Sequence, residues 1–223
     1  MTSPAPRRGR PARLSRPQIV GVALELVDAE GVDALTMRAL ARRLEADPMA
    51  VYRHVRDKAD LLGAMCDTVV ADLPALDPDG PWRPQVAELA GQLRERLAAH
   101  PALLPVLAGA PVTPAGLAVT QQALALLVAH GVPVDVAATG FGAVFSYVLG
   151  FALVEAALPA LDADRDELRA GALAHLGDPD PPPAHLDEAL ALLETPGDFA
   201  FGLDLLLDGL ERRAGGPVSP PGP

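Results

Sequence analysis

The stretch from Thr36 to Lys58, TMRALARRLEADPMAVYRHVRDK, constrains the fold of this chain more than any other segment. It predicts two short helices joined by a tight turn at Glu45-Ala46. Thr36 is a favourable N-cap residue, and the apolar residues after it recur at spacings of three and four, which gives one apolar helix face: Met37, Leu40, Ala41, Leu44. Asp47 can cap the second helix, and Pro48 suits its first turn, where a missing N–H costs nothing.

The second of these helices carries side chains that suit the major groove of DNA. Val51 and Val55 are expected to be buried, which leaves other residues to point elsewhere: Met49, Ala50, Tyr52, Arg53, His54. A small apolar tip can contact base edges and thymine methyl groups, while Tyr, His and Lys side chains hold phosphates. The stretch therefore predicts a helix-turn-helix DNA-binding unit.

The pattern Thr-x-Arg-x-Leu-Ala-x-x-Leu, then Tyr-x-His-Val-x-x-Lys, then Leu61-Leu62, resembles the DNA-binding domain of the TetR family of bacterial repressors. The resemblance covers nearly all of residues 15–213, because Trp82 opens a helix and the segments FGLD (201–204) and GLE (209–211) resemble the final helix of the tetracycline-repressor branch. It implies an all-α fold with an N-terminal three-helix helix-turn-helix domain and a larger helical ligand-binding and dimerisation domain.

The resemblance, together with turn and charge patterns, divides the chain into five parts. We expect a disordered basic arm (1–14), the DNA-binding domain with its connecting helix (15–73), a linker (74–81), the ligand-binding and dimerisation domain (82–213) and a disordered tail (214–223). The first helix should run from Ser15 or Arg16 to Glu30 and end at Gly31. The connecting helix should run from Asp57 or Lys58 to about Leu73.

The resemblance also implies contacts residue by residue. Arg38 resembles an arginine that reaches a guanine edge, and Pro48 and Met49 occupy the base-reading tip. The family contacts phosphates at the positions of Thr36, Ala50, Tyr52, His54 and Lys58. Four positions depart from the family. Glu45 stands where many members have Gly, and Met49 and Arg53 replace Pro and Trp of the tetracycline branch, so the operator need not be shared. Ala50 has no hydroxyl for the phosphate contact of its counterpart.

The basic arm and the charge distribution also point to nucleic acid. Residues 1–58 hold 11 Lys/Arg and 7 Asp/Glu, whereas residues 59–223 hold 7 and 22, so a basic head precedes an acidic body. Arg8 and Arg10 lie in an RGRP segment that resembles the AT-hook core, whose arginines enter a narrow minor groove. The alternative is a solvated tail that touches phosphates without sequence preference.

The chain is expected to be cytoplasmic. We find no apolar segment after the basic N-terminus that would make a signal peptide, and we expect no apolar run long enough to span a membrane. The single cysteine, Cys66, excludes an internal disulfide framework; it is interpreted as a buried structural thiol, with a redox sensor as the alternative.

Further helices are expected in the body at 82–99, 113–130, 133–158, 183–194 and 197–213, with a short apolar segment at 101–112. Residues 159–183 are rich in Asp and Pro and are interpreted as a mobile loop with one helical turn near 164–174. In the helix at 133–158, Gly142, Ser146 and Gly150 recur every four residues, a pattern that permits close helix contact. Ordinary packing within the chain is one interpretation. The resemblance implies dimer contact instead, together with the apolar stripe of the last helix: Leu203, Leu206, Leu207, Leu210.

The resemblance further locates a ligand site. The positions that bind the drug and its magnesium ion in the tetracycline branch correspond to Leu89, Leu93, Leu107, Ala110, Ala123 and Ser146. Leu107 replaces the metal-binding imidazole and cannot ligate a hard cation, so we expect no tetracycline–magnesium response, no metal and no cofactor. An apolar cavity with Phe141 and Phe145 in its lining and polar anchors such as Gln121, Gln122 or His100 is expected; a solid core is the alternative.

These features predict a homodimeric repressor that a small, mostly apolar effector releases from a palindromic operator. The alternative is a constitutive or architectural DNA-binding dimer without an effector. An enzyme is not expected, because the histidines show no metal-ligand spacing and the chain has no Gly-rich phosphate loop.

Overall fold

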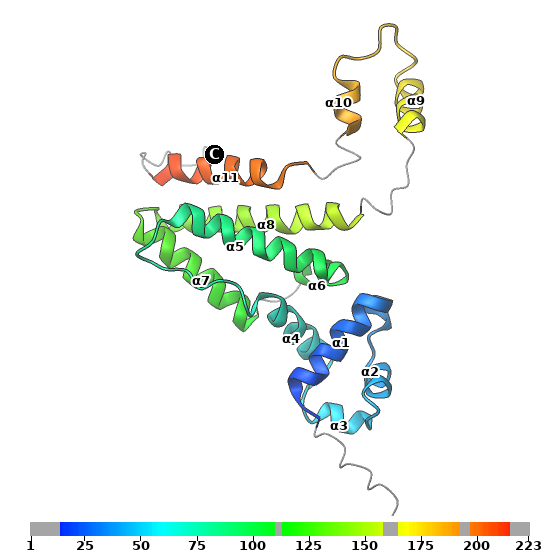
Figure 1. Ribbon diagram of the computed structural model, residues 1–223, viewed down its shortest axis with the longest axis vertical. Coiled ribbons are helices and arrows are strands. Elements are labelled where there is room, and N and C mark those ends of the chain that lie inside the picture. Colours follow the sequence, from blue (N-terminus) through cyan, green and yellow to red (C-terminus); the bar gives the residue numbers. More distant parts are fainter. Residues whose placement is uncertain (1–13, 110–112, 158–164, 192–196, 215–223) are drawn as a thin grey trace, which may run out of the picture. The chain divides into compact units, whose positions relative to one another are not determined.

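The computed structural model describes residues 14–109, 113–157, 165–191 and 197–214, and every regular element in these ranges is helical (Figure 1). In chain order the elements are α1 (Arg16–Glu30), η1 (Val32–Ala34), α2 (Met37–Arg43), α3 (Pro48–Tyr52), α4 (Lys58–Val70), α5 (Trp82–Ala99), η2 (Pro101–Leu103), α6 (Leu104–Gly109), α7 (Pro114–Ala129), α8 (Val134–Ala157), α9 (Arg165–His175), α10 (Leu186–Ala191) and α11 (Phe199–Ala214). The predicted all-α class is confirmed.

The chain forms two compact units, residues 1–65 and residues 66–223, and the boundary between them falls inside α4. This boundary precedes the predicted linker at 74–81, and the division into domains made from the sequence stays a prediction.

The first unit is a small helical unit whose core is the apolar face of α1. The Ser15 hydroxyl accepts the backbone N–H of Gln18 at the start of α1, and Gly31 ends the helix with a φ of +82°, as expected for this helix. Buried side chains come from α1, α2, the α3 region and α4: Ile19, Leu26, Val27, Leu40, Val51, Val55, Leu61, Met65. Both α2 and α3 are therefore fixed by packing into the same hydrophobic core.

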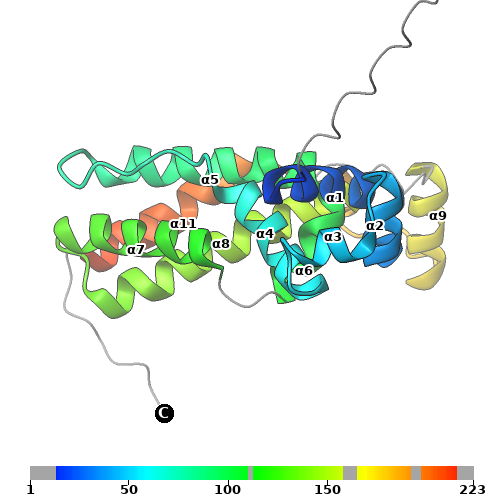
Figure 2. The same cartoon turned by 90° about the horizontal axis from the view of Figure 1, so that it is seen from below.

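The second unit is built around α8, which packs against α5, α7 and α11 (Figures 1 and 2). Glycines permit the close approach of α8 and α11. A Cβ atom on Gly140 would collide with Leu210, and one on Gly202 would collide with Tyr147. By contrast, a Cβ atom on Gly142 or Gly150, which the sequence singled out, would have no neighbour within 4 Å, so these two glycines play no part in this crossing.

The length of α8 corrects one expectation. This helix has 24 residues and, by length and composition alone, is long and apolar enough to cross a membrane, whereas the sequence was expected to hold no such run. Core helices of helical domains pass the same test. However, only 22% of its most apolar window is buried within the protomer, so α8 keeps an uncovered apolar surface.

Three other segments differ from expectation. The apolar segment after His100 forms η2 and α6. The predicted loop with a single helical turn contains α9, which is 11 residues long. Asp166 and Glu167 in its first turn and His175 in its last suit the helix dipole. The next helix, α10, begins at Leu186, three residues later than the predicted start at residue 183. Arg169 of α9 donates to Asp187 of α10 at 3.0 Å and joins these two helices.

Candidate nucleic-acid interface and ligand cavity

Local hydrogen bonds position α2 and α3 as the sequence predicts. The Thr36 hydroxyl accepts the N–H of Ala39 at 3.1 Å, and the Asp47 carboxylate accepts the N–H of Met49 at 2.7 Å. Between the helices, Glu45 adopts a φ of +49°, a left-handed conformation that glycine adopts more easily. The turn between α2 and α3 therefore has a residue in the left-handed region, although that residue is Glu45 and not glycine.

The surface of α2 and α3 carries most of the predicted DNA contacts. Met49 is 69% exposed and Tyr52 is 44% exposed. Other predicted contacts are exposed (Thr36, Arg38, Pro48, Arg53) or half-buried (Ala50, His54). Arg43 differs from its neighbours because it forms an ion pair with Glu30 at 2.8 Å. Arg8 and Arg10 of the basic arm lie outside the described residues.

Lys58, a predicted phosphate contact, already has a partner in the protein. Its Nζ donates to the backbone oxygen of Val32 at 3.1 Å, and the side chain is half-buried. An ammonium group has three protons, so two remain for other acceptors. Lys58 thus joins the first turn of α4 to η1 and still holds protons that a phosphate could accept.

An ion pair that the sequence did not reveal fixes the backbone just after α3. The guanidinium of Arg16 donates to both carboxylate oxygens of Asp60, at 2.8 and 3.1 Å, and to the backbone oxygen of His54 at 2.7 Å. The hydrogen bond from Arg16, followed by one from the backbone N–H of Arg56, lowers the pKa of Asp60 to about 2. Arg16 and Asp60 are 44 residues apart, so no local pattern could have paired them.

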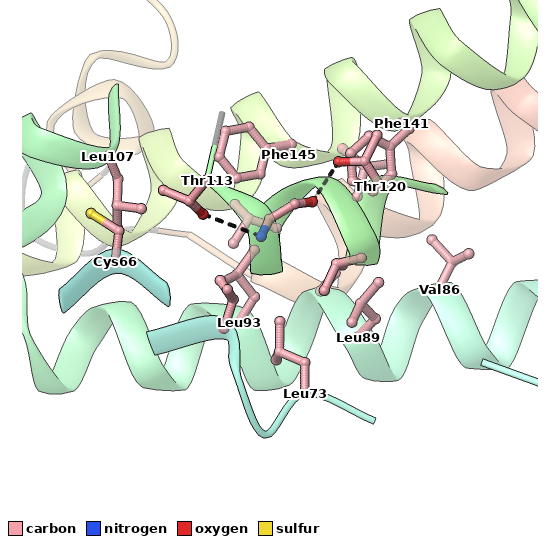
Figure 3. A pocket seen from close by; sticks show the side chains of 16 residues that line it. Cys66, Leu73, Val86, Leu89, Leu93, Leu107, Thr113, Thr120, Phe141 and Phe145 are labelled. Carbon is pink, nitrogen blue, oxygen red and sulfur yellow. Dashed lines mark hydrogen bonds between the residues drawn. The ribbon is translucent and has the colours of Figure 1, made fainter. Parts of the chain in front are cut away.

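The second unit contains a cavity of about 290 Å³ (Figure 3). Leu89 and Leu93 of α5 line it, and Figure 3 shows Phe141 and Phe145 of α8 across from these leucines. Leu107 of α6 also lines it. These five residues belong to the ligand site that the sequence predicted.

Other predicted ligand residues lie elsewhere. The side chain of Gln122 accepts the N–H of Leu76 at 3.4 Å, Ala123 is fully buried, and Ser146 is exposed; none of them lines the cavity. Ala110 lies outside the described residues. Among the described residues, no group of three or more His, Cys, Asp or Glu side chains is close enough to hold a metal ion.

The sequence missed the polar part of the lining. Thr113 and Thr120 contribute hydroxyl groups, and both bond to the backbone of Gly116 in α7. Thr113 is recognisable from sequence as a helix cap, but nothing local indicates that its hydroxyl faces a cavity. Cys66 also lines the cavity, and burial raises the pKa of its thiol to about 11, which keeps it neutral.

Helix α4 takes part in this cavity through Cys66 and Val70. Next to Cys66, the carboxylate of Asp67 accepts the N–H of Ala115 at 3.0 Å, at the start of α7. The positive end of a helix dipole favours a carboxylate there. Asp67 therefore ties α4 to the helix that carries both cavity threonines.

The residues predicted for the dimer contact fall into two groups. Gly142, Ser146 and Gly150 are exposed on α8. Leu203, Leu207 and Leu210 are buried within the protomer, and Leu206 is half-buried. The large apolar side chains exposed on the two helices are instead Val134, Leu153 and Val154 of α8 and Phe201 and Leu205 of α11. The leucine stripe of α11 thus packs inside the protomer, and the opposite face of the same helix is exposed.

The fold and these features define a transcriptional regulator that joins a helix-turn-helix unit to a helical unit with an apolar cavity. The profile described as bacterial regulatory proteins, tetR family, matches residues 19–65, and that of the tetracyclin repressor-like C-terminal domain matches residues 73–214. The chain belongs to the TetR family of bacterial regulatory proteins.

Curated relatives agree with this family. An HTH-type transcriptional regulator of Saccharopolyspora erythraea is 36% identical over 140 residues, 61% of this chain and 59% of that protein. The HTH-type transcriptional repressor DrrR1 of Streptomyces coeruleorubidus is 33% identical over 68% of this chain and 57% of its own length. These two matches thus span less than two thirds of the relatives. The class G tetracycline repressor of Vibrio anguillarum is 30% identical, with 90% and 95% covered.

Solved structures show the same fold. ActR of Streptomyces coelicolor in complex with actinorhodin has a TM-score of 0.73 and 30% identity, covering 92% of this chain and all of that chain. BioQ with its double-stranded DNA operator has a TM-score of 0.62 and 27% identity, covering 89% of this chain and 99% of that chain.

Proposed function

We propose that this protein is a homodimeric, cytoplasmic repressor that leaves a palindromic operator when a small, mostly apolar effector enters its second unit. It acts by binding and not by catalysis. The apolar cavity that α4 lines is the observation that carries this proposal, because α4 also begins in the DNA-binding unit. An effector can shift affinity for DNA only by binding the two conformational states with different affinities.

The exposed side chains of α2 and α3 support the DNA-binding half. Arg38 is suited to a guanine edge, and Pro48 and Met49 form the tip of the reader helix. The phosphate contacts come from Thr36, Tyr52, His54 and Lys58, together with the backbone of Ala50. Arg53, which replaces Trp of the tetracycline branch, contributes to a preference for a different operator sequence. In the arm, Arg8 and Arg10 enter the adjacent minor groove. The operator complex of BioQ is a precedent for this use of the fold.

The uncovered apolar surface of α8 and α11 supports the dimer. Gly142, Ser146 and Gly150 are small, exposed residues of α8, and the large apolar side chains of Leu153 in α8 and Phe201 in α11 are exposed as well. A second copy of the same surface would cover it across a two-fold axis. The heads of such a dimer would meet half-sites about 34–36 Å apart, one helical turn of DNA.

The alternative is a constitutive dimer whose second unit only dimerises. A solid core would favour that function, whereas the cavity of about 290 Å³ favours an effector. ActR and the tetracycline repressors are regulators known with small ligands or named for them, which supports the same choice.

The test is selection of operators by the full-length protein from a random duplex library, followed by titration of the enriched sequence across a salt series. We expect a palindromic consensus and a steep loss of affinity with salt. Arg38→Ala should weaken specific binding by about 1–3 kcal/mol, and Tyr52→Phe should weaken it less, through one phosphate contact. Arg42→Ala is the matched control for Arg38, because Arg42 is an exposed arginine of the same helix outside the predicted contact set.

Two results would contradict the proposal. If no sequence is enriched and both variants bind DNA like the wild type, the reader helix is not used. If a specific complex forms but no apolar compound that binds the protein releases it, the constitutive alternative holds.

A further inference from the structure

The cavity lining restricts the chemistry of the ligand beyond its apolar character. We propose that the cavity takes an uncharged ligand of about two fused rings whose carbonyl oxygen accepts a hydrogen bond from the hydroxyl of Thr113. This assignment rests on the proposed effector function and specifies the ligand of that same site.

The lining excludes a charged ligand. Apart from Cys66, Thr113 and Thr120, the described side chains that line the cavity are hydrocarbon, and none of them is charged. Burial keeps the Cys66 thiol protonated, so it offers no counter-charge either. An acid or an amine would have to enter without an ionic partner, which is strongly unfavourable in an apolar site.

The volume restricts size. About 290 Å³ lies at the lower end of the volumes of small-molecule sites. Two fused rings with one short substituent suit this volume. Phe141 and Phe145 on one wall and Leu89 and Leu93 on the other, as seen in Figure 3, suit the faces of a flat ring system.

The two hydroxyls differ in what they can offer a ligand. Thr120 donates its only hydroxyl proton to the backbone oxygen of Gly116 at 2.9 Å, so it can only accept further bonds. Thr113 accepts the N–H of Gly116 at 3.2 Å, and this bond does not use its proton. Thr113 is therefore the hydroxyl of this pair that can donate to a carbonyl (Figure 3).

The probe 6-propionyl-2-(dimethylamino)naphthalene matches this description, because it is an uncharged two-ring ketone. Its emission moves to longer wavelength when its carbonyl accepts a hydrogen bond. With the full-length protein we expect saturable binding. Thr113→Gly should shift the bound emission to shorter wavelength and weaken binding by about two- to tenfold, the effect of one neutral hydrogen bond. Glycine is tolerated at an N-cap, so α7 should still form.

Three variants and one competing anion serve as controls. Thr113→Ser keeps a hydroxyl and should restore both the emission and the affinity. Thr120→Val removes the other hydroxyl and should leave the emission unchanged. Val119→Phe fills the cavity from α7 and should abolish binding. The anion 2-naphthoate, of similar size, should not compete with the probe.

The outcomes separate this assignment from the proposed function. Saturable binding that Val119→Phe abolishes, with emission and affinity unchanged in Thr113→Gly, would overturn the role of Thr113 and leave the effector site standing. Competition by 2-naphthoate would overturn the uncharged class alone. No saturable binding, or binding that Val119→Phe does not alter, would overturn the assignment, while release of the operator by apolar compounds remains the separate test of the effector function.

Discussion

Glu45 is held in the left-handed region at the turn between α2 and α3, with a φ of +49°. A residue with a Cβ atom is less stable there than glycine, by about 1–2 kcal/mol, although glycine gives back part of this through its greater freedom in the unfolded chain. We therefore expect Glu45→Gly to raise the free energy of unfolding by about 0.5–1 kcal/mol. Urea unfolding followed by circular dichroism would measure this change.

The neighbouring residue provides the control. Ala46 is outside the positive-φ residues of the described chain, so Ala46→Gly should lower the free energy of unfolding by about 0.5–1 kcal/mol. If both glycine variants shift stability in the same direction, backbone conformation is not what distinguishes the two positions.

The brace between Arg16 and Asp60 should make the first unit sensitive to acid. The pKa of Asp60 lies at about 2 instead of its usual 3.8, so its ion pair stabilises the folded state fully above the usual pKa and is lost as pH falls towards 2. Asp60→Asn should lower the free energy of unfolding by about 1–2 kcal/mol at pH 7, and this difference from the wild type should shrink between pH 4 and pH 2. Urea unfolding at a series of pH values would measure it.

The exposed pair of Arg43 and Glu30 is the matched control, since it also joins α1 to another helix of the first unit, α2, where the brace joins α1 to α4. Glu30→Gln should change stability by less than about 0.5 kcal/mol. A difference between wild type and Asp60→Asn that stays constant from pH 7 to pH 2 would contradict the role of the Asp60 carboxylate.

At the residue scale, the sequence predicted what is local. The caps at Thr36 and Asp47 and the burial of Val51 and Val55 follow from neighbours within four positions, and the structure confirms them. The Arg16–Asp60 brace joins residues 44 apart, and the cavity hydroxyls face their site only after α5, α7 and α8 have packed, so neither has a local pattern.

At the scale of helices, the crossing of α8 and α11 depends on glycines that the four-residue pattern did not include. Gly140 faces Leu210, which is 6% exposed and so has little room to move. Gly140→Ala should destabilise the protein by about 1–3 kcal/mol through overpacking. Thermal unfolding and limited proteolysis of α11 would detect the loss.

Gly91 in the middle of α5 is the control, because nothing lies within 4 Å of where its Cβ would be. Gly91→Ala should instead stabilise the protein by about 0.5–1 kcal/mol through helix propensity. Equal effects at the two positions would mean that the crossing is looser than the contact with Leu210 indicates.

The helices were predicted best where apolar periodicity is long. The bounds of α5, α7, α8 and α11 agree with prediction to within about two residues, the usual uncertainty of helix ends. The helical turn expected near 164–174 is the full helix α9, whose length was underestimated because the sequence around it is rich in Asp and Pro. The small-residue strip of α8 was noticed, but sequence alone could not separate the residues that face α11 from those that face outwards.

At the scale of the whole molecule, the uncovered apolar face of α8 should determine the oligomeric state. Leu153 is 52% exposed on this face, and a buried, unpaired charge there would oppose association. We expect Leu153→Arg to convert a dimer into a monomer in analytical ultracentrifugation and to reduce operator binding with it.

Leu117 of α7 is the control, since it is 46% exposed but lies on another helix. Leu117→Arg should leave the dimer intact. Should Leu153→Arg stay dimeric while Leu117→Arg does not, the dimer would form through α7.

The position of the unit boundary has a practical consequence for anyone who builds hybrid sensors from proteins of this kind. Met65 is buried in the first core and Cys66, the next residue of the same helix, lines the cavity. In a hybrid joined at residues 74–81, the cavity residues Cys66, Val70 and Leu73 would come from the protein that supplies the DNA-binding unit. One extra residue inside α4 would turn every later side chain by about 100° around its axis, so hybrids should be joined at equivalent helical positions and not merely at flexible loops.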